Sequence, residues 1–247
     1  MERQELLSFL DAYLNVDHFQ DYGKNGLQVH GSPTVQRIVS GVTFSRRLID
    51  EAILHKAELI LVHHGLFKGD IPDPPCFHGP LRDRLALLFA YNLNLAAYHL
   101  PLDAHPDVGN NALACKKLGL NDLHPLDVGF IGHLSRPESL KSFIRKVETL
   151  YGRQVLALEF GPTRIQRVAI ISGGSSTLWE TALQAEADLF ICGDMKESLV
   201  RKIEEMNFNV LAAGHYHTEI LGIKALSELI REKFPIEVSF IDIPSPV

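Results

Sequence analysis

The chain has 247 residues, 46% of them hydrophobic and 22% charged, an ordinary balance for a globular protein of one large or two small domains. The net charge of −6 argues against a dedicated nucleic-acid binder, although a local basic patch is compatible with it. The three cysteines form no CxxC pair, which argues against a disulfide framework or a thiolate zinc site.

The first half of the chain alternates helical and strand patterns. Its charged start lacks an apolar leader, and no apolar run reaches membrane-spanning length, so we expect a cytoplasmic protein without a membrane segment. Leucines at helical spacing predict a helix over about residues 3–15. Beyond a loop containing Asn25-Gly26, the patterns predict strands at 37–42, 59–62 and 93–98, helices at about 46–56, 81–91 and 110–118, and a Pro-rich loop over 70–80.

The second half follows the same pattern. It predicts helices at about 138–150, 177–186, 196–206 and 219–233, and strands near 155–159, 167–171, 189–192, 210–213 and 236–241. Strands that alternate with helices favour an α/β fold with a mostly parallel sheet in each half. We therefore expect two similar α/β lobes, residues 1–125 and 126–247, with the C-terminal segment completing the first lobe.

The two halves resemble distant copies of one another. The segment from Arg37 to His64 matches the segment that begins 130 positions later at Arg167 and ends at Asp194, without a gap. Further on, Leu95–His99 resembles Leu211–His215. We interpret this as duplication; the alternative is chance similarity between two ordinary strand–helix–strand units.

Three predicted strands end in segments that carry histidine. His63-His64 follows the second strand, His99-Leu100-Pro101-Leu102-Asp103 the third, and His215-Tyr216-His217-Thr218-Glu219 the strand near 210–213. Ligands of open α/β sheets bind beyond the carboxyl ends of strands, where all three segments lie. Imidazole and carboxylate donors together suit zinc, iron or manganese. The sequence therefore predicts two divalent metal ions bound by His63, His64, Asp103, His215 and Glu219.

The predicted donors also differ in role. Asp103 and Glu219 are the expected bridges, because a carboxylate can bridge two ions and an imidazole does not. Adjacent histidines in an extended segment point apart, so His63 and His64 can each bind a different ion. Such a set keeps positions open for water, as catalytic sites do. His99 is either a further ligand or a partner of one. The alternative for each histidine is a structural role, since a histidine pair at a strand end can be a hydrogen-bonded corner.

At these residues the chain resembles the NGG-interacting-factor-three family, the YbgI-like proteins known as type-2 GTP cyclohydrolase homologues. The resemblance covers nearly the whole chain. The segments that carry it are Asp21-Tyr22, Asn25-Gly26-Leu27-Gln28-Val29, Val62-His63-His64-Gly65, His99-Leu100-Pro101-Leu102-Asp103, Gly214-His215-Tyr216 and Thr218-Glu219. It implies a two-lobed α/β fold, two metal ions at the lobe interface held by the same five residues, and a homohexameric ring. Two departures are Glu197-Ser198 after the Gly-Asp of the second half, where many relatives carry histidines, and His217, where alanine is common.

The predicted activity is metal-assisted hydrolysis. His99 or His217 is the expected proton shuttle, because imidazole titrates near neutral pH. One version is opening of the GTP ring by attack at the purine C8, and hydrolysis of a phosphoester or amide is another. The rival hypothesis is a non-enzymatic scaffold, metal-storage or metal-insertion protein. We expect no membrane partner and no nucleic acid.

A substrate site is predicted at the glycine-rich turn after the strand at 167–171. Backbone N–H groups there can approach an anion, which suits a nucleotide phosphate, whereas the alternative is a tight turn with a helix cap. The candidate substrate-binding residues are Gly173, Gly174, Ser175, Asn25 and Lys196.

Overall fold

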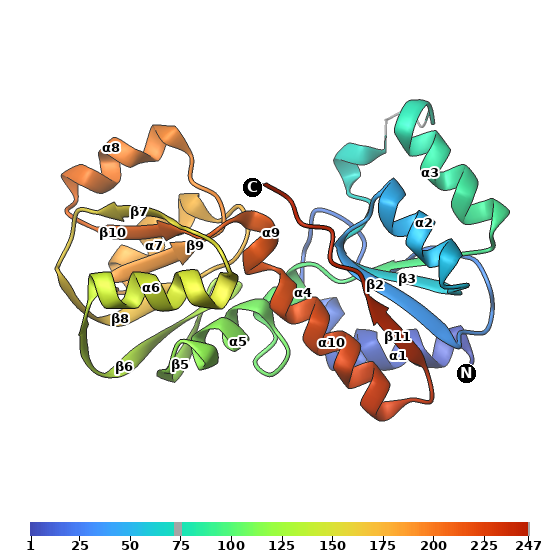
Figure 1. Ribbon diagram of the computed structural model, residues 1–247, viewed down its shortest axis with the longest axis horizontal. Coiled ribbons are helices and arrows are strands. Elements are labelled where there is room, and N and C mark those ends of the chain that lie inside the picture. The colour runs from blue at the N-terminus through green and yellow to red at the C-terminus, as the bar shows by residue number, and fades with distance from the viewer. Residues whose placement is uncertain (72–75, 247) are drawn as a thin grey trace. The chain divides into compact units, whose positions relative to one another are not determined.

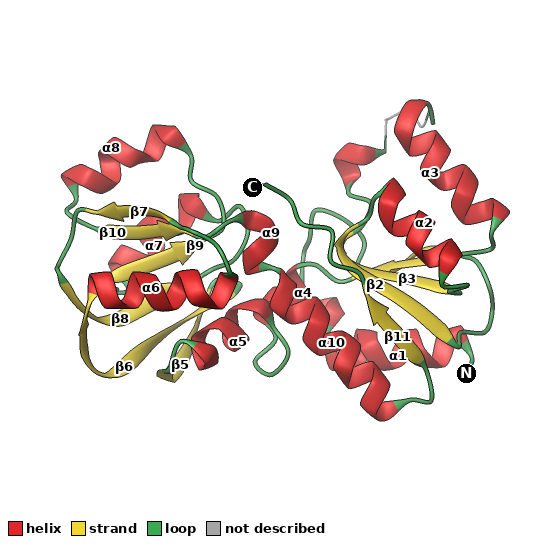
Figure 2. Cartoon of the chain, viewed as in Figure 1, coloured by secondary structure: helices red, strands yellow, loops and turns green. Residues whose placement is uncertain are grey.

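The computed structural model describes residues 1–71 and 76–246 and forms two compact units. The first unit comprises Met1–Leu102 and Ile223–Ile243, and the second comprises Asp103–Gly222 and the segment from Pro244. Each unit contains one β-sheet with helices against it, so the predicted α/β class is confirmed (Figures 1 and 2). Within the described residues, no helix combines the length and the apolar character that crossing a membrane requires.

The first unit contains a five-stranded sheet in the order β1-β4-β3-β2-β11. Only β1 pairs antiparallel; the other neighbours are parallel. Figure 1 shows α2 and α3 on one side of this sheet and α1 and α10 on the other. The bounds are α1 Arg3–Tyr13, β1 Gly26–Val29, β2 Arg37–Thr43, α2 Arg46–Leu54, β3 Leu59–His64, α3 Gly79–Ala90, β4 Asn94–Ala97, α4 Leu100–Ala104, α10 Ile220–Lys233 and β11 Glu237–Phe240, with short 3-10 turns at Val16–His18 and Lys68–Asp70.

The second unit contains a six-stranded sheet in the order β5-β6-β8-β9-β10-β7. Apolar residues of α5 and α6 pack against one face, and those of α7 and α8 against the other. The bounds are α5 Asn110–Lys117, β5 Leu120–Leu126, β6 Gly129–Ser139, α6 Leu140–Tyr151, β7 Leu156–Glu159, β8 Arg164–Ile170, α7 Trp179–Gln184, β9 Leu189–Cys192, α8 Glu197–Glu205, β10 Asn209–Ala212 and α9 His215–Thr218, with a 3-10 turn at Ser176–Leu178.

The two sheets share a four-stranded core with the same topology. Ile38 pairs with Leu59 in the first sheet, and the residues 130 positions later, Val168 and Leu189, pair in the second. In each core the outer strand, β1 or β7, runs antiparallel to its neighbour, whereas the remaining pairs are parallel. This agreement in register supports the interpretation that the chain arose by duplication.

In each core, the strand that comes last along the chain, β4 or β10, begins with a buried asparagine. The Asn94 Nδ2 donates to the carbonyl oxygen of Glu58 at 2.8 Å, and the Asn209 Nδ2 donates to that of Asp188 at 3.1 Å. These bonds align Asn94 with Asn209. The match of Leu95 with Leu211 is therefore wrong by one position, and His99 and His215 are not equivalent residues.

Two features differ from the sequence-based expectations. The sequence missed β1 and the β5–β6 hairpin, which makes the second sheet mixed rather than mostly parallel. Residues 103–125, which lay within the first lobe expected to end at residue 125, belong to the second unit, because β5 pairs with β6. Within the Pro-rich loop expected at 70–80, residues 72–75 lie outside the described part of the chain.

Candidate metal centre

Three histidines gather at the carboxyl ends of two neighbouring strands in the first unit. His63 and His64 end β3, and His99 follows β4, which is parallel to β3. One ring nitrogen from each lies within 4.8 Å of the other two. His63 is fully buried, and the other two side chains are half-buried. Three imidazoles placed this closely can hold a metal ion.

Hydrogen bonds orient two of these rings. The His63 Nδ1 lies 2.9 Å from the carbonyl oxygen of Tyr98, and the His64 Nδ1 lies 3.1 Å from the Thr43 Oγ1. A carbonyl oxygen only accepts, so the His63 Nδ1 carries the hydrogen and its Nε2 carries the lone pair. Metal-binding histidines in proteins generally have this arrangement, with the remote nitrogen as ligand and the other nitrogen bonded to the protein.

His99 is held by a carboxylate instead. Its Nδ1 lies 2.7 Å from the Asp21 Oδ1, while Asn25 donates to Asp21 and accepts from the backbone N–H of His99. Burial raises the pKa of Asp21, but hydrogen bonds from His99 and Asn25, the charge of His99 and the Leu100 N–H outweigh burial and lower the pKa to about 2. Asp21 is therefore an anion that fixes the His99 ring.

The second unit places Asp103 in a preorganised polar pocket. The carboxylate is only 4% exposed, and its Oδ1 accepts from the Asn110 Nδ2 at 2.8 Å and from the Ser172 hydroxyl at 2.9 Å. Asn111 holds Ser172 in place, because its Oδ1 accepts a hydrogen bond from the backbone N–H of Ser172. These partners orient the Asp103 carboxylate, as hydrogen bonds to ligating carboxylates commonly do in metal sites.

His215 lies between two carboxylates of the second unit. Its Nε2 is 3.3 Å from the Glu219 Oε1, and its Nδ1 is 2.6 Å from the Asp194 Oδ2. The hydrogen bond to Glu219 has the largest effect on the pKa of His215 and raises it, whereas burial lowers it. The charges of Glu219 and Asp194 raise the pKa further, and together these effects bring it to about 9. The metal-free protein therefore holds a proton on His215 at neutral pH.

This proton makes the stability of the metal-free protein depend on pH. The folded-state pKa of His215 lies above its ordinary value of 6.5, so the stabilisation is complete below about pH 6.5 and is lost as the pH rises through about 9. We expect urea unfolding of the chelator-treated chain to show this decline. The Glu219→Gln variant should show a weaker decline, and an equal decline in both proteins would contradict the assignment to this pair.

The glycine-rich turn after β8 packs against the His215–Glu219 pair. Gly173 has a φ of 65°, and a Cβ atom there would collide with the Glu219 carboxylate and approach the His215 Nε2 to 3.3 Å. The Gly173 N–H donates to the Thr218 hydroxyl at 3.1 Å. The Ser175 hydroxyl donates to the carbonyl oxygen of Ile171 at 2.5 Å. The turn therefore contacts His215 and Glu219, the two candidate ligands, directly.

The remaining residues predicted for the site are Asn25, Lys196 and His217. Asn25 is engaged by Asp21 and the His99 backbone, whereas Lys196 is exposed at the start of α8. His217 lies on α9, where its Nδ1 is 3.1 Å from the Arg153 Nη1. Gly214, with a φ of 92°, makes room for this contact, because a Cβ atom there would collide with the Arg153 guanidinium.

Sequence reasoning missed the residues that orient the candidate ligands. The sequence indicates Asp21 only as part of a motif and predicts no role for Asp194 or Arg153. The signal available for Asp194 was its place directly after a buried strand, where site residues of α/β sheets gather. The sequence offered no signal for Arg153.

The chain matches the Duf34/NIF3 (NGG1p interacting factor 3) family over residues 1–246. It is 40% identical over 251 residues to an Escherichia coli (strain K12) protein named "GTP cyclohydrolase 1 type 2 homolog", with 100% of both chains covered. It is 39% identical over 252 residues to a protein of the same name from Pyrococcus abyssi (strain GE5 / Orsay), with 99% of each covered.

Two solved structures are similar to the chain over its whole length. The structure titled "protein ybgI, unknown function" has a TM-score of 0.94 and 39% identity, with 100% of both chains covered. TTHA1606 from Thermus thermophilus has a TM-score of 0.92 and 37% identity, again with 100% of both covered. These similarities agree with the resemblance that the sequence motifs indicated, and the chain belongs to the Duf34/NIF3 family.

Proposed function

We propose that this chain binds two divalent metal ions and uses them to hydrolyse a nucleotide or another phosphorylated small molecule. The observation that carries the proposal is the orientation of three imidazoles. In His63, His64 and His215 a group of the same unit lies within hydrogen-bond distance of Nδ1, so we assign Nε2 as the proposed metal ligand. The proposed ligands are His63, His64, Asp103, His215 and Glu219.

The donor chemistry fits zinc, iron or manganese. Neutral imidazole suits these ions, and the carboxylates of Asp103 and Glu219 add the negative charge that balances a dication. Both carboxylates are almost fully buried, at 4% and 2% exposure, and a buried anion is stabilised by a cation. Two divalent ions, when bound, lower the pKa of water and polarise the bond under attack.

His99 and His217 take complementary proton-handling roles in this proposal. Asp21 holds the Nδ1 of His99, which orients the ring to accept a proton at Nε2. The Arg153 guanidinium can only donate, so it supports a His217 tautomer with the hydrogen on Nε2, which then donates. His99 is accordingly the proposed base and His217 the proposed hydrogen-bond donor to substrate.

The names of relatives suggest the first substrate to test. Curated relatives carry the name "GTP cyclohydrolase 1 type 2 homolog", so GTP is the proposed starting compound. Gly173, Gly174 and Ser175 are the proposed contacts to its phosphates. The homohexameric ring implied by the resemblance stays a prediction.

The test is incubation of the zinc-, iron- or manganese-loaded chain with GTP and a panel of phosphorylated compounds, followed by chromatography. We expect a hydrolysis product whose rate of formation falls about 100-fold or more in His99→Ala. His55→Ala, which removes an exposed histidine from the end of α2 in the same unit, is the control and should keep full activity. Bound metal without turnover of any compound would instead favour the scaffold, storage or insertion hypothesis.

A further inference from the structure

A polar cavity of about 560 Å³ lies in the second unit, distant from the candidate metal donors of that unit. Its walls are the end of α5, the last part of β6, the first half of α6 and the start of β8. It includes Arg164 at the amino end of β8, whereas Ser172, which bonds Asp103, follows the carboxyl end of the same strand. Eight residues of extended chain separate the two by roughly 25 Å.

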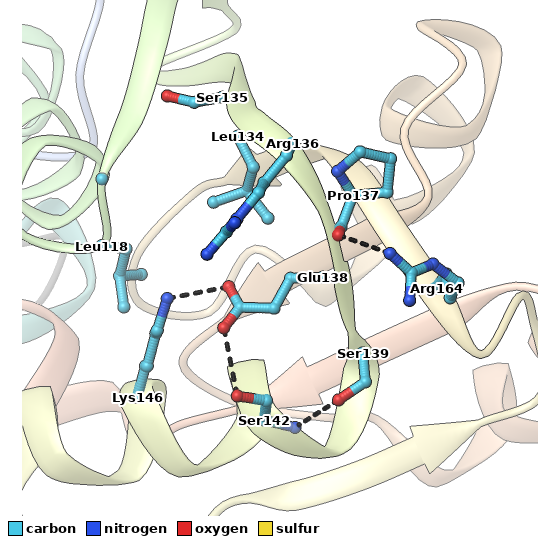
Figure 3. A pocket seen from close by; sticks show the side chains of 11 residues that line it. Leu118, Leu134, Ser135, Arg136, Pro137, Glu138, Ser139, Ser142, Lys146 and Arg164 are labelled. Atoms are coloured by element: carbon cyan, nitrogen blue, oxygen red, sulfur yellow. Dashed lines mark hydrogen bonds and ion pairs between the residues drawn. The ribbon is translucent and has the colours of Figure 1, made fainter.

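An irregularity in β6 forms one wall of this cavity. His133 pairs with Arg167 and Glu138 pairs with Ile165, so five steps along β6 match only two along β8. The segment 134–137 consequently bulges out of the sheet, and Pro137 within it could not donate a ladder hydrogen bond. Figure 3 shows Arg136, on this bulge, and Lys146, on α6, directed into the same space beside Glu138.

The charges in the cavity leave a positive excess. Among the lining residues, Glu138 is the only acid, and its oxygens lie 2.8 Å from the Lys146 Nζ and 3.0 Å from the Ser142 hydroxyl. Lys146 thus neutralises Glu138. Arg136 makes no hydrogen bond or ion pair with the described part of the chain, and Arg164 uses Nη2 to donate to the Pro137 carbonyl oxygen at 2.7 Å.

The basic surface continues into a neighbouring hollow of about 440 Å³ that shares Lys146 and adds Lys117 and Arg145. Three of the eleven residues lining the first cavity are lysine or arginine, and so are three of the seven lining the second. The whole chain has only 24 in 247 residues and a net charge of −6. The positive charge is therefore concentrated here rather than a consequence of composition.

We infer that this cavity binds the phosphate groups of a small phosphorylated molecule. Arginine and lysine recognise phosphate through charge-assisted hydrogen bonds, and the hydroxyl of Ser135 adds a neutral donor. The volume lies within the range of small-molecule sites. None of the described residues that line the cavity is aromatic, so these residues offer no stacking surface of the kind with which proteins hold the bases of single-stranded nucleic acid. The site is independent of the proposed hydrolase function.

The test is calorimetric titration of the metal-loaded chain with inorganic pyrophosphate. We expect saturable binding that weakens about tenfold in Arg136→Gln and further in Arg136→Gln/Lys117→Gln. The matched control is Lys141→Gln, which removes one exposed charge from α6 without altering the lining and should change the affinity by less than about twofold. All replaced side chains are exposed, and thermal melting verifies that each variant is folded.

Three outcomes would overturn the inference. The first is no binding by the parent chain, or equal binding by Arg136→Gln. The second is loss of binding in Glu219→Gln, which would place pyrophosphate on the metal donors instead. The third is binding of a single-stranded RNA that is tighter than pyrophosphate binding and lost in the same variants, which would identify a nucleic-acid surface. Retention in Glu219→Gln with loss in Arg136→Gln supports the inference whether or not the proposed hydrolase activity is found.

Discussion

Replacing Gly173 with alanine is expected to lower the free energy of unfolding and the metal content together. The residue has a φ of 65°, a conformation that costs an L-amino acid about 1–3 kcal/mol. The added Cβ atom would also collide with the Glu219 carboxylate, which is 2% exposed and has little room to move. Urea unfolding and elemental analysis of the purified variant measure the two effects.

The adjacent glycine is the matched control. A Cβ atom at Gly174 would meet the His215 Cε1 at 3.6 Å, an ordinary van der Waals distance, and its φ is not in the left-handed region. Gly174→Ala should therefore leave metal content unchanged and stability within about 0.5 kcal/mol of the parent. If Gly173→Ala were as stable and as rich in metal as Gly174→Ala, the turn would not position Glu219.

The second large effect is expected from Asp194→Asn. The Asp194 carboxylate lies 2.6 Å from the His215 Nδ1 and orients the ring, so its loss should weaken metal affinity about 10–100-fold. The amide keeps the size of the side chain but removes the negative charge. Competition for the metal with a chromogenic chelator measures the change in affinity.

Asp188→Asn provides the comparison for this variant. Asp188 lies just before the amino end of β9 and accepts hydrogen bonds from the backbone N–H groups of Gln166 and Arg167 at 2.8 Å. The same substitution there should reduce stability without reducing metal affinity. Equal affinity in the parent and in Asp194→Asn would show that Asp194 does not support His215 as a ligand.

Periodicity predicted most of the fold. Regular helices such as α6, whose buried residues recur at helical spacing, and short buried strands such as β9 were located within a few residues. The β5–β6 hairpin was missed because Pro125 and Pro137 interrupt the strand pattern. The structure accommodates Pro125 on an edge strand and Pro137 in a bulge, and neither position is visible in a single sequence.

The candidate donors were predictable for a different reason. Parallel strands end at one edge of a sheet, so residues such as His63 and His99 are brought together by topology alone. Most of their orienting partners were not predictable, because they come from distant parts of the chain. Asp21 reaches His99 across 78 positions, and Asp103 accepts from Ser172 across 69. Only the packed structure supplies such pairs.

Elemental analysis is the most direct test of metal binding by His63, His64, Asp103, His215 and Glu219. The chain is purified without chelators beside His64→Ala and Glu219→Gln, and all three are then offered zinc, iron or manganese. We expect about two ions per parent chain and loss of metal in both variants. Metal-poor parent protein that added ions do not load, or an unchanged content in both variants, would show that the histidines are structural.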